Sequence, residues 1–312
     1  MRQAVSTNIA SSPQVLEADV SSQTQADSSD VIQRNTRGWR AWLHSFRPST
    51  LAFWGVHAVA VVGAIAYFSW TGVLIAIASY FVRMVLVTLA YHRYFSHRSF
   101  KTSRWFQFLL ALGAQSSAQK GVLWWASHHR HHHKYSDGEK DIHSVRRSGF
   151  WHSHLGWILG SEWDHTNSAL IGDLTKYREL RVLNHSAVCL LPAVALAFAC
   201  LWLGGAHAEV WGFLVSTVMI WHGSFSINSL SHMFGKRRYE TTDDSRNNWA
   251  LAILTTGEGW HNNHHHYQSS ANQGFRWWEI DVTFYVLRVL EFFGFIWELR
   301  RPPAAVVTGT AA

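Results

Sequence analysis

The stretch PSTLAFWGVHAVAVVGAIAYFSWTGVLIAIASYFV, residues 48–82, contains no Asp, Glu, Lys or Arg in 35 residues. A helix that crosses a bilayer needs roughly 20 apolar residues. The stretch is too long for one such helix and, when it is extended through Met84–Tyr91, long enough for two. It therefore predicts a helical hairpin with membrane spans at about 50–70 and 72–91 and a turn near Trp70–Gly72.

Two further uncharged runs, Val182–Ala208 and Val210–Gly235, follow later in the chain. They predict spans at about 187–203 and 211–230, with a turn at the sequence GGAHAE between them. Four spans place both termini on the same side of the membrane. The predicted fold class is an all-α integral membrane protein with four transmembrane helices and a helical cap, the cap being built from residues 92–185 and 231–300.

Basic residues beside the spans predict their orientation, because Lys and Arg are enriched in cytoplasmic loops. The two short turns contain no Lys or Arg, whereas the segment before the first span contains Arg34, Arg37, Arg40 and Arg47. Both termini and the cap are therefore predicted to be cytoplasmic, as in a multi-pass protein of a bacterial inner membrane. This topology and anionic membrane lipid account for the formal net charge of +7, so we expect no nucleic-acid partner.

The ends of the chain differ from its centre in composition. Residues 1–33 are rich in Ser, Gln and Asp and have almost no aromatic residues, which predicts a disordered tail. Residues 34–300 form the predicted membrane domain. Residues 301–312, with the sequence RPPAAVVTGTAA, are expected to be frayed.

Three dense histidine clusters lie outside the predicted spans: HRYFSH at 92–97, HHRHHH at 128–133 and HNNHHH at 261–266. A fourth contribution comes from NSLSH at 228–232, at the cytoplasmic end of the fourth span. All four segments are on the predicted cytoplasmic side, where a compact cap can bring them together. A metal transporter would instead place its ligands near the middle of the membrane.

The spacing within the clusters selects among their histidines, because residues three and four apart share a helix face. His129, His132 and His133 fit this rule, as do His261, His264 and His265, so each H-x-x-H-H pattern is expected to present two or three imidazoles to one point. His128 and His131 point elsewhere. In the first cluster His92 and His97 are five apart, so they converge only if the helix ends or bends there.

The number of imidazoles favours two metal ions. Imidazole is a good ligand for Fe, Zn, Cu and Ni, and a structural zinc ion would be closed by four ligands. Nine or ten candidates are too many for one ion. Two redox-capable ions beside a membrane indicate oxygen activation.

The sequence resembles the membrane fatty acid desaturases of the stearoyl-CoA/Δ9 type over roughly residues 45–300. The resemblance is carried by HRYFSHRSF, HHRHHHKYSD, DIHSVRRSGFWHSHLGW, NSLSH and GEGWHNNHHHYQ. It implies a four-helix membrane stem, a cytosolic cap that holds two iron ions, and removal of two hydrogens from an acyl chain with O2 as co-substrate. Carried over by position, the metal ligands would be His92, His97, His129, His132, His133, His232, His261, His264 and His265, with Asn228 holding a metal-bound water.

Further residues near the clusters can support such a site. Ligating imidazoles usually donate their second N–H to a carboxylate or carbonyl, and the nearby candidates are Glu258, Asp137, Asp141, Asp243 and Asp244. An apolar tunnel would hold one methylene pair beside the metal. Its candidate residues are Trp124, Trp125, Trp151, Trp157 and Trp260, and Tyr80 in the second span is a candidate for limiting acyl length.

Several points stay open in the sequence. A related di-iron hydroxylase would share the ligands. Acyl-CoA members of the family carry basic residues before the second histidine cluster and after the HxGW stretch, but this chain has Ser127–His128 and Ser161–Glu162 there and only Lys120 nearby. The substrate is therefore either an acyl-CoA or an acyl-lipid.

We expect no haem or flavin in this chain, and a separate electron donor that is a ferredoxin, a cytochrome b5-like protein or a flavin-linked reductase. Arg83, a charge inside a span, is expected to snorkel to the interface.

Overall fold

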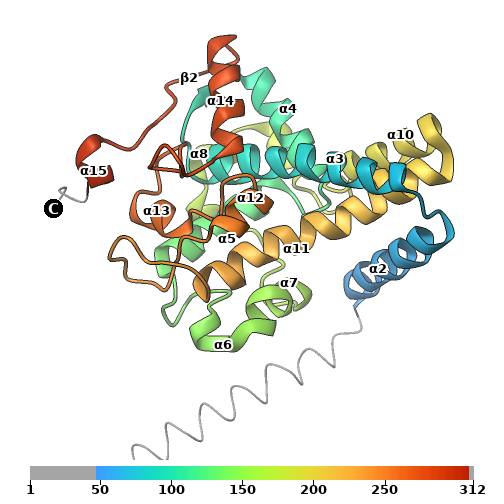
Figure 1. Cartoon of the computed structure of the whole chain (residues 1–312), viewed down its shortest axis with the longest axis horizontal. Coiled ribbons are helices and arrows are strands. Elements are labelled where there is room, and N and C mark those ends of the chain that lie inside the picture. The colour runs from blue at the N-terminus through green and yellow to red at the C-terminus, as the bar shows by residue number, and fades with distance from the viewer. Residues whose placement is uncertain (1–46, 309–312) are drawn as a thin grey trace, which may run out of the picture. The chain divides into compact units, whose positions relative to one another are not determined.

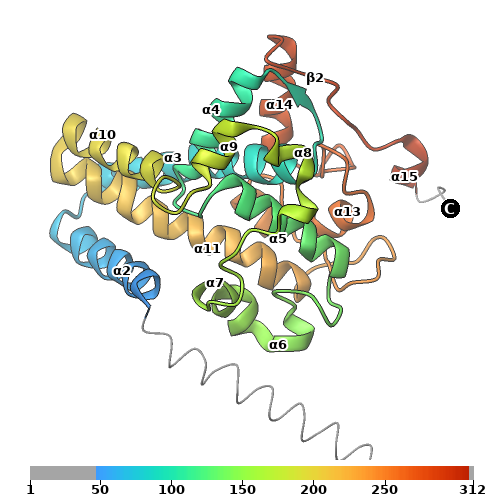
Figure 2. The same ribbon diagram turned by 180° about the vertical axis from the view of Figure 1, so that it is seen from behind.

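The computed structural model describes residues 47–308 (Figures 1 and 2). The predicted disordered tail, residues 1–33, and residues 309–312 lie outside the described part of the chain. Within residues 47–308 the chain is mostly helical. Three of its helices are long and apolar enough to cross a membrane: Pro48–Ala66, Trp70–Ser96 and Leu191–His232.

The first two of these helices form the predicted hairpin. Helix α2 (Pro48–Ala66) has proline in its first turn, where its missing N–H is harmless. Helix α3 (Trp70–Leu86) begins after Ser69, whose side-chain oxygen accepts a hydrogen bond from the Gly72 amide at 2.9 Å. The turn therefore covers residues 67–69 and not the predicted 70–72, because the serine caps the second helix.

The third apolar helix is interrupted. It consists of α10 (Leu191–Ala208), the π-helix η4 (Glu209–Val215), α11 (Ser216–Ser229) and the short 3-10 helix η5 (Leu230–His232). Gly204 and Gly205 have non-helical backbone angles, and the positive φ of 62° at Gly205 is one that glycine adopts without strain. The break falls within the predicted GGAHAE turn, and α10 packs against η4 beyond it.

The remaining elements form a helical layer around the end of α3. They are β1 (Lys101–Thr102), α4 (Arg104–Gln115), α5 (Val122–Tyr135), α6 (Val145–Trp151), η2 (His152–Gly156), α7 (Trp157–Leu159), η3 (Ser168–Leu170), α8 (Gly172–Thr175), α9 (Arg178–Leu183), α12 (Trp249–Leu254), α13 (His261–His266), α14 (Val282–Phe292), β2 (Ile296–Trp297) and α15 (Ala304–Thr308). The two short strands pair antiparallel, a small departure from the predicted all-α fold. A helix at 304–308, with Val306 buried against Tyr239 and Phe275, replaces the fraying expected there.

The centre of this layer is a π-helix, η1 (Val87–Ser96), which continues α3 and is buried along its whole length. Its apolar residues, among them Tyr91, Tyr94 and Phe95, belong to the largest hydrophobic cluster, together with residues of α4 and α5. The continuous helix of α3 and η1, 27 residues long, is longer than one span because its last part lies inside the protein. α4, α5 and α14 pack against η1.

Arg83 does not snorkel, contrary to the sequence-based expectation. Its side chain is 4% exposed and lies between α3, α4 and α11. The guanidinium donates to Ser216 Oγ at 2.8 Å, to Thr217 Oγ1 at 2.9 Å and to the Ser116 carbonyl at 2.6 Å. A charge this deep is held by these polar groups of neighbouring helices.

A string of three histidines connects α2 to the rest of the protein. His57 Nδ1 donates to the Phe53 carbonyl at 2.8 Å, and its Nε2 lies 3.1 Å from His222 Nε2 on α11. His222 Nδ1 lies 3.0 Å from His154 Nε2 on η2. His57 and His154 are thus partnered groups on either side of His222.

We expect His222→Phe to weaken the attachment of α2. The change removes two hydrogen bonds in the middle of the string, each worth about 1 kcal/mol, and leaves Nε2 of His57 and Nε2 of His154 without these partners. The apparent unfolding temperature in detergent should fall by about 4–8 °C. His165→Phe, at an exposed histidine, is the matched control. Equal melting of the two variants would contradict the structural role of the string.

Candidate metal centre

Nine histidine side chains converge in the cap and form two groups. The first group contains His92, His97, His129, His133 and His264, and the second contains His132, His232, His261 and His265. Within each group one ring nitrogen from every histidine lies within 4.8 Å of the others, a spacing at which the group can hold a metal ion. These nine are the histidines that the family resemblance selects from the 21 in the chain.

The π-helix η1 explains how the first histidine cluster contributes. A π-helix closes hydrogen bonds from residue i to i+5, and the His97 amide donates to the His92 carbonyl at 3.2 Å. His92 and His97 are therefore one turn apart, with ring centroids separated by 4.8 Å. The five-residue spacing predicted that the two rings converge only where the helix ends or bends, and the structure brings them together by widening the helix into a π-helix.

The two H-x-x-H-H patterns are divided between the groups. On α5, His129 and His133 join the first group, while His132 joins the second. On α13, His261 and His265 join the second group, while His264 joins the first. Two imidazoles of each pattern therefore meet at one point, as the spacing predicts, and the third joins the other group. Each pattern contributes to both groups, because residues four apart superpose more closely than residues three apart on a 3.6-residue helix.

Burial keeps most of these imidazoles neutral. It lowers the pKa of His97, His129, His133, His261 and His264 well below the ordinary value, and neighbouring histidines lower it further. Burial also lowers the pKa of His265 to about 4, against the opposing effect of Asp243. A neutral imidazole has a free lone pair, and this is the form that binds metal ions.

Carboxylates hold four of the nine rings from behind. His92 Nδ1 lies 2.6 Å from Glu258 Oε2, His132 Nδ1 lies 2.9 Å from Asp141 Oδ1, His232 Nδ1 lies 2.9 Å from Asp137 Oδ2, and His265 Nδ1 lies 2.6 Å from Asp243 Oδ2. Each contact orients the ring so that Nε2 faces the centre of its group. Asp244 lies apart, since its carboxylate pairs with Arg146.

Glu258 is itself part of a buried charge network that sequence reasoning missed. Arg93 NH2 lies 3.0 Å from Glu258 Oε1 and 2.9 Å from Asp281 Oδ1, and Gln273 Nε2 donates to Glu258 Oε2 at 2.8 Å. Burial raises the pKa of Glu258, but His92 and Arg93 outweigh it and lower the pKa to about 2. The position of Arg93, directly after His92 within the first histidine cluster, could have indicated that a cation lies beside the site.

The facing nitrogens fit a metal ion. Metal–imidazole bonds of about 2.1 Å place two ligand nitrogens about 3 Å apart when the bonds are at right angles. In the first group His92 Nε2 and His133 Nε2 lie 3.1 and 3.0 Å from His264 Nε2, and in the second His232 Nε2 lies 3.1 Å from His261 Nε2. His132 Nε2 and His265 Nε2 are buried without a hydrogen-bond partner among the described residues.

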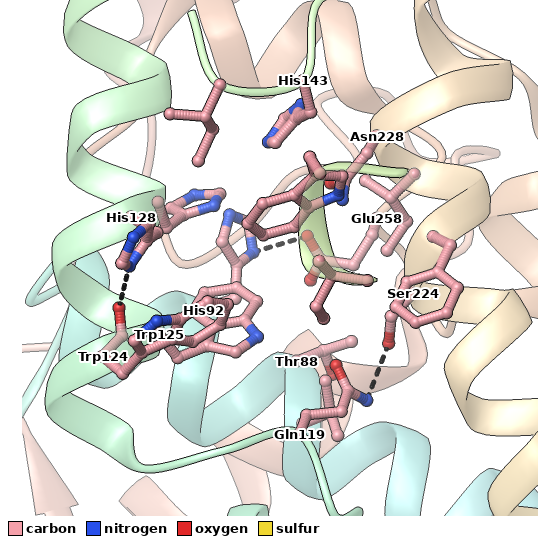
Figure 3. Close-up of a pocket in the computed structure, with 17 residues that line it drawn as sticks. Thr88, His92, Gln119, Trp124, Trp125, His128, His143, Ser224, Asn228 and Glu258 are labelled. Atoms are coloured by element: carbon pink, nitrogen blue, oxygen red, sulfur yellow. Dashed lines mark hydrogen bonds and ion pairs between the residues drawn. The ribbon is translucent and has the colours of Figure 1, made fainter. Parts of the chain in front are cut away.

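A narrow, largely apolar cavity reaches the first group (Figure 3). Its lining includes His92 and His129, as well as Asn228 and Glu258. Gln119 Nε2 donates to Ser224 Oγ at 3.1 Å, and Figure 3 shows this pair beside Thr88 at one end, with His143 and Asn228 near the other. The mostly apolar wall of the cavity has the polarity that suits an acyl chain.

Three of the predicted tunnel tryptophans line this cavity and two do not. Trp124, Trp125 and Trp157 belong to its wall. The prediction for Trp151 is wrong, because its side chain is 73% exposed on α6. Trp260 is buried elsewhere, where its Nε1 donates to the Ile280 carbonyl at 2.9 Å.

Tyr80 is also outside the lining. It is buried between α3 and α11, and its hydroxyl donates to the Leu254 carbonyl at 2.7 Å. Sequence reasoning missed Gln119, Ser224 and His143, since a lone glutamine, serine or histidine outside the dense clusters gives no signal of its own. His143 stacks on His132 with ring centroids 4.2 Å apart.

The two histidines set aside by the spacing rule lie outside both groups. His128 is buried, and its Nδ1 donates to the Trp124 carbonyl at 2.8 Å. His131 Nε2 donates to the Lys140 carbonyl at 2.7 Å. Between them, Arg130 donates to the carbonyls of Phe95 and Ser96 and so fixes the end of η1.

The described residues thus combine candidate membrane helices, two polyhistidine groups that can hold metal ions, and an apolar cavity that reaches the first group. A model of the fatty acid desaturase family matches residues 68–294. The chain is 36% identical over 282 residues to Delta-9 acyl-lipid desaturase 2 of Arabidopsis thaliana, which is 88% of this chain and 91% of that protein. It is 35% identical over 266 residues to the sn-1 stearoyl-lipid 9-desaturase of Synechocystis sp., 83% and 81% of the two chains.

A third relative, the Acyl-CoA 5-desaturase AL21 of Anemone leveillei, is 38% identical over 253 residues, 80% of this chain and 77% of that protein. The chain belongs to the fatty acid desaturase family. It is an oxidoreductase that desaturates fatty acyl chains, and a membrane protein, and the prediction drawn from its histidine motifs is confirmed at this level.

Two neighbouring histidines of α5 provide a test of the grouping. We expect His132→Ala to lower the iron content of the purified protein by one or two ions per chain and to abolish desaturation, because His132 belongs to the second group. His131→Ala should retain both the iron content and the desaturase activity of wild type, because the His131 ring hydrogen-bonds to a backbone carbonyl at the edge of the site. Iron is counted by inductively coupled plasma mass spectrometry. Equal loss in both variants would show that the grouping is wrong.

Proposed function

We propose that this desaturase uses two iron ions and O2 to introduce a cis double bond, at the Δ9 position, into a saturated acyl chain. The observation that carries the proposal is the meeting of the apolar cavity with the first imidazole group. The names of the relatives from Arabidopsis and Synechocystis support the Δ9 position.

The five imidazoles of the first group would hold one iron ion, and the four of the second group, with a water held by Asn228, would hold the other. When bound, the two ions supply the oxidising power for cleaving unactivated C–H bonds with O2. The carboxylates of Glu258, Asp137, Asp141 and Asp243 keep the ligand rings in place. Such outer partners typically contribute a factor of about 10–100 to metal affinity.

The cavity would determine which carbon atoms react. Its walls exclude water from the site and hold one methylene pair beside His92 and His129. The Gln119–Ser224 hydrogen bond ties the loop before α5 to α11, and both residues line the cavity, so this contact shapes the path of the chain. Overall, the acyl –CH2–CH2– unit, one O2, two electrons and two protons give –CH=CH– and two water molecules.

We further propose that the chain crosses the membrane four times, with the cap and both termini in the cytoplasm. The break at Gly204–Gly205 and the packing of α10 on η4 support a turn there. A continuous helix of 42 residues would be about 63 Å long, twice the thickness of the hydrocarbon core.

An acyl-lipid is the substrate class that we propose in place of an acyl-CoA. Among the described residues, the cavity lining contains no Lys or Arg that would bind the phosphates of CoA. The neighbouring Lys120 lies 2.7 Å from Asp164, which also pairs with Arg47. Two of the relatives are named for lipid-linked substrates and one for acyl-CoA.

Expression in a desaturase-deficient host tests the reaction and the carrier together. After a short pulse of labelled stearate, we expect Δ9-monounsaturated chains to appear first in membrane glycerolipids and only later in the acyl-CoA pool. Gas chromatography of each pool gives the double-bond position. Hydroxy fatty acids without new double bonds would contradict the proposal and indicate a hydroxylase.

A second test concerns the cavity. Ser224→Phe should fill the end of the cavity at Gln119 and lower turnover of an 18-carbon chain at least about tenfold, while the iron content stays the same, because Ser224 contacts no histidine of either group. Ser224→Ala is the matched control, since it removes the hydrogen bond without adding bulk. A phenylalanine variant with unchanged turnover and chain-length preference would show that the acyl chain lies elsewhere.

A further inference from the structure

A second opening reaches the histidine groups from solvent. This polar hollow shares no lining residue with the apolar cavity and is lined by His133, the segment Glu240–Asp243, His265, His266 and Gln268. Glu240 and Thr242 are exposed, so the hollow opens to water. Its volume of about 420 Å³ is more than twice the roughly 180 Å³ that six water molecules occupy at about 30 Å³ each. A hydrated metal ion therefore fits inside it.

The inner end of the hollow lies against one imidazole of each group. His133 belongs to the first group and His265 to the second, and their ring centroids are 4.4 Å apart. His265 is 7% exposed, and its Nε2 has no hydrogen-bond partner among the described residues. An ion in the hollow therefore stands beside rings of both groups, at the point where the groups meet.

The charge of the lining is negative. Glu240 and Asp243 are its carboxylates, and the described residues that line it include no Lys or Arg. Asp243 is held by His265 Nδ1 at 2.6 Å and by the Ser245 amide, which donates to it at 3.0 Å. Arg237 contacts the lining through the Thr241 carbonyl, but it is exposed, so water and salt screen its charge. The field in the hollow therefore attracts a cation.

Two ligands near the mouth are free to bind such a cation. The Glu240 carboxylate has no hydrogen bond or ion pair within residues 47–308. His266 is the one histidine of the third cluster that belongs to neither group. Its ring stacks on Tyr239 with centroids 4.1 Å apart, and no hydrogen bond to a described residue occupies its nitrogens. Imidazole and carboxylate together are typical ligands of Fe²⁺.

The apolar cavity is a poor route for a metal ion. Its wall is formed largely by apolar side chains, among them Trp124, Trp125 and Trp157. A divalent ion that gave up its water against this wall would gain few ligands in exchange, and such an uncompensated loss of hydration is costly. The carboxylates and imidazoles of the polar hollow can instead replace the water molecules one at a time.

We propose that the polar hollow is the entrance through which Fe²⁺ reaches both histidine groups, and that Glu240 and His266 bind the arriving ion first. The inference rests on the proposed function, which names iron as the metal. The ion exchanges its water molecules for these two side chains and then for the ring nitrogens of the groups. Its charge and oxidation state stay the same, and the released water leaves through the open mouth.

Metal loading can be followed without acyl substrate or O2. The full-length protein in lipid nanodiscs is stripped with a chelator and mixed anaerobically with Fe²⁺, and bound iron is counted at intervals by inductively coupled plasma mass spectrometry. Co²⁺, whose visible absorption changes when imidazole binds it, gives a continuous trace. Glu240→Lys should slow loading at least about tenfold at low salt. The final content should stay at two ions per chain, because Glu240 belongs to neither group.

His266→Phe is a second variant that is mild for folding. It keeps an aromatic ring against Tyr239 and removes the two nitrogens. We expect slower loading with the same final iron content. Because the equilibrium is then unchanged, release of iron into excess chelator should slow by the same factor as loading. A lower final content at an unchanged loading rate would mean that His266 supports the groups from behind, and would overturn its role at an entrance.

The matched control is Glu162→Lys, which makes the same change in charge beside the other opening. Glu162 is exposed and precedes Trp163, whose carbonyl accepts a hydrogen bond at 2.7 Å from Trp124 in the wall of the apolar cavity. This variant should load at the wild-type rate. Equal slowing in Glu162→Lys and Glu240→Lys would contradict the proposed entrance and indicate a general charge effect, and slowing in Glu162→Lys alone would place the entrance at the apolar cavity.

The same titrations separate this inference from the proposed function. If wild type binds no iron at equilibrium, the proposed use of two iron ions fails, while the Co²⁺ trace still tests the entrance. If wild type, Glu240→Lys and His266→Phe all load two ions at the same rate, the entrance is wrong and the proposed function stands.

Discussion

The facing of nine imidazoles, six buried and three half-buried, is the constraint on which the rest of this structure depends. Burial keeps most of the rings neutral, so lone pairs of neighbouring rings point at one another across about 3 Å. Such an arrangement is unfavourable for bare nitrogens and favourable around metal cations. The sequence supports it with a rigid frame: four carboxylates orient four rings, and Arg93 and Asp281 hold one of those carboxylates.

The need to place nine imidazoles in two groups explains several local features, of which the π-helix is one that would otherwise lower stability. The π-helix η1 forms hydrogen bonds between residues five apart and not the usual four, and this spacing aligns His92 with His97. The patterns on α5 and α13 each divide between the groups, which links the two sites through the same helices. The apolar cavity reaches His92 and His129, whereas a separate polar hollow beside Thr241 reaches His133 and His265.

Local pattern was enough to predict the family, the apolar hairpin and the nine histidines, because long uncharged runs and dense clusters are signals within short stretches. The assignment of rings to groups was not predictable. It depends on the π-helical widening at Val87–Ser96 and on the meeting of segments more than a hundred residues apart. Arg83 was predicted to snorkel because its acceptors, Ser216 and Thr217, are distant in sequence. Gln119 and Ser224 gave no signal for the same reason.

Anomalous X-ray scattering at the iron absorption edge, measured on crystals of the iron-loaded protein, would locate the metal ions among the nine histidines. We expect two iron peaks per chain, one among the Nε2 atoms of His92, His97, His129, His133 and His264 and one among those of His132, His232, His261 and His265. A single iron peak, or two peaks with His132 on the same ion as His129, would contradict this grouping.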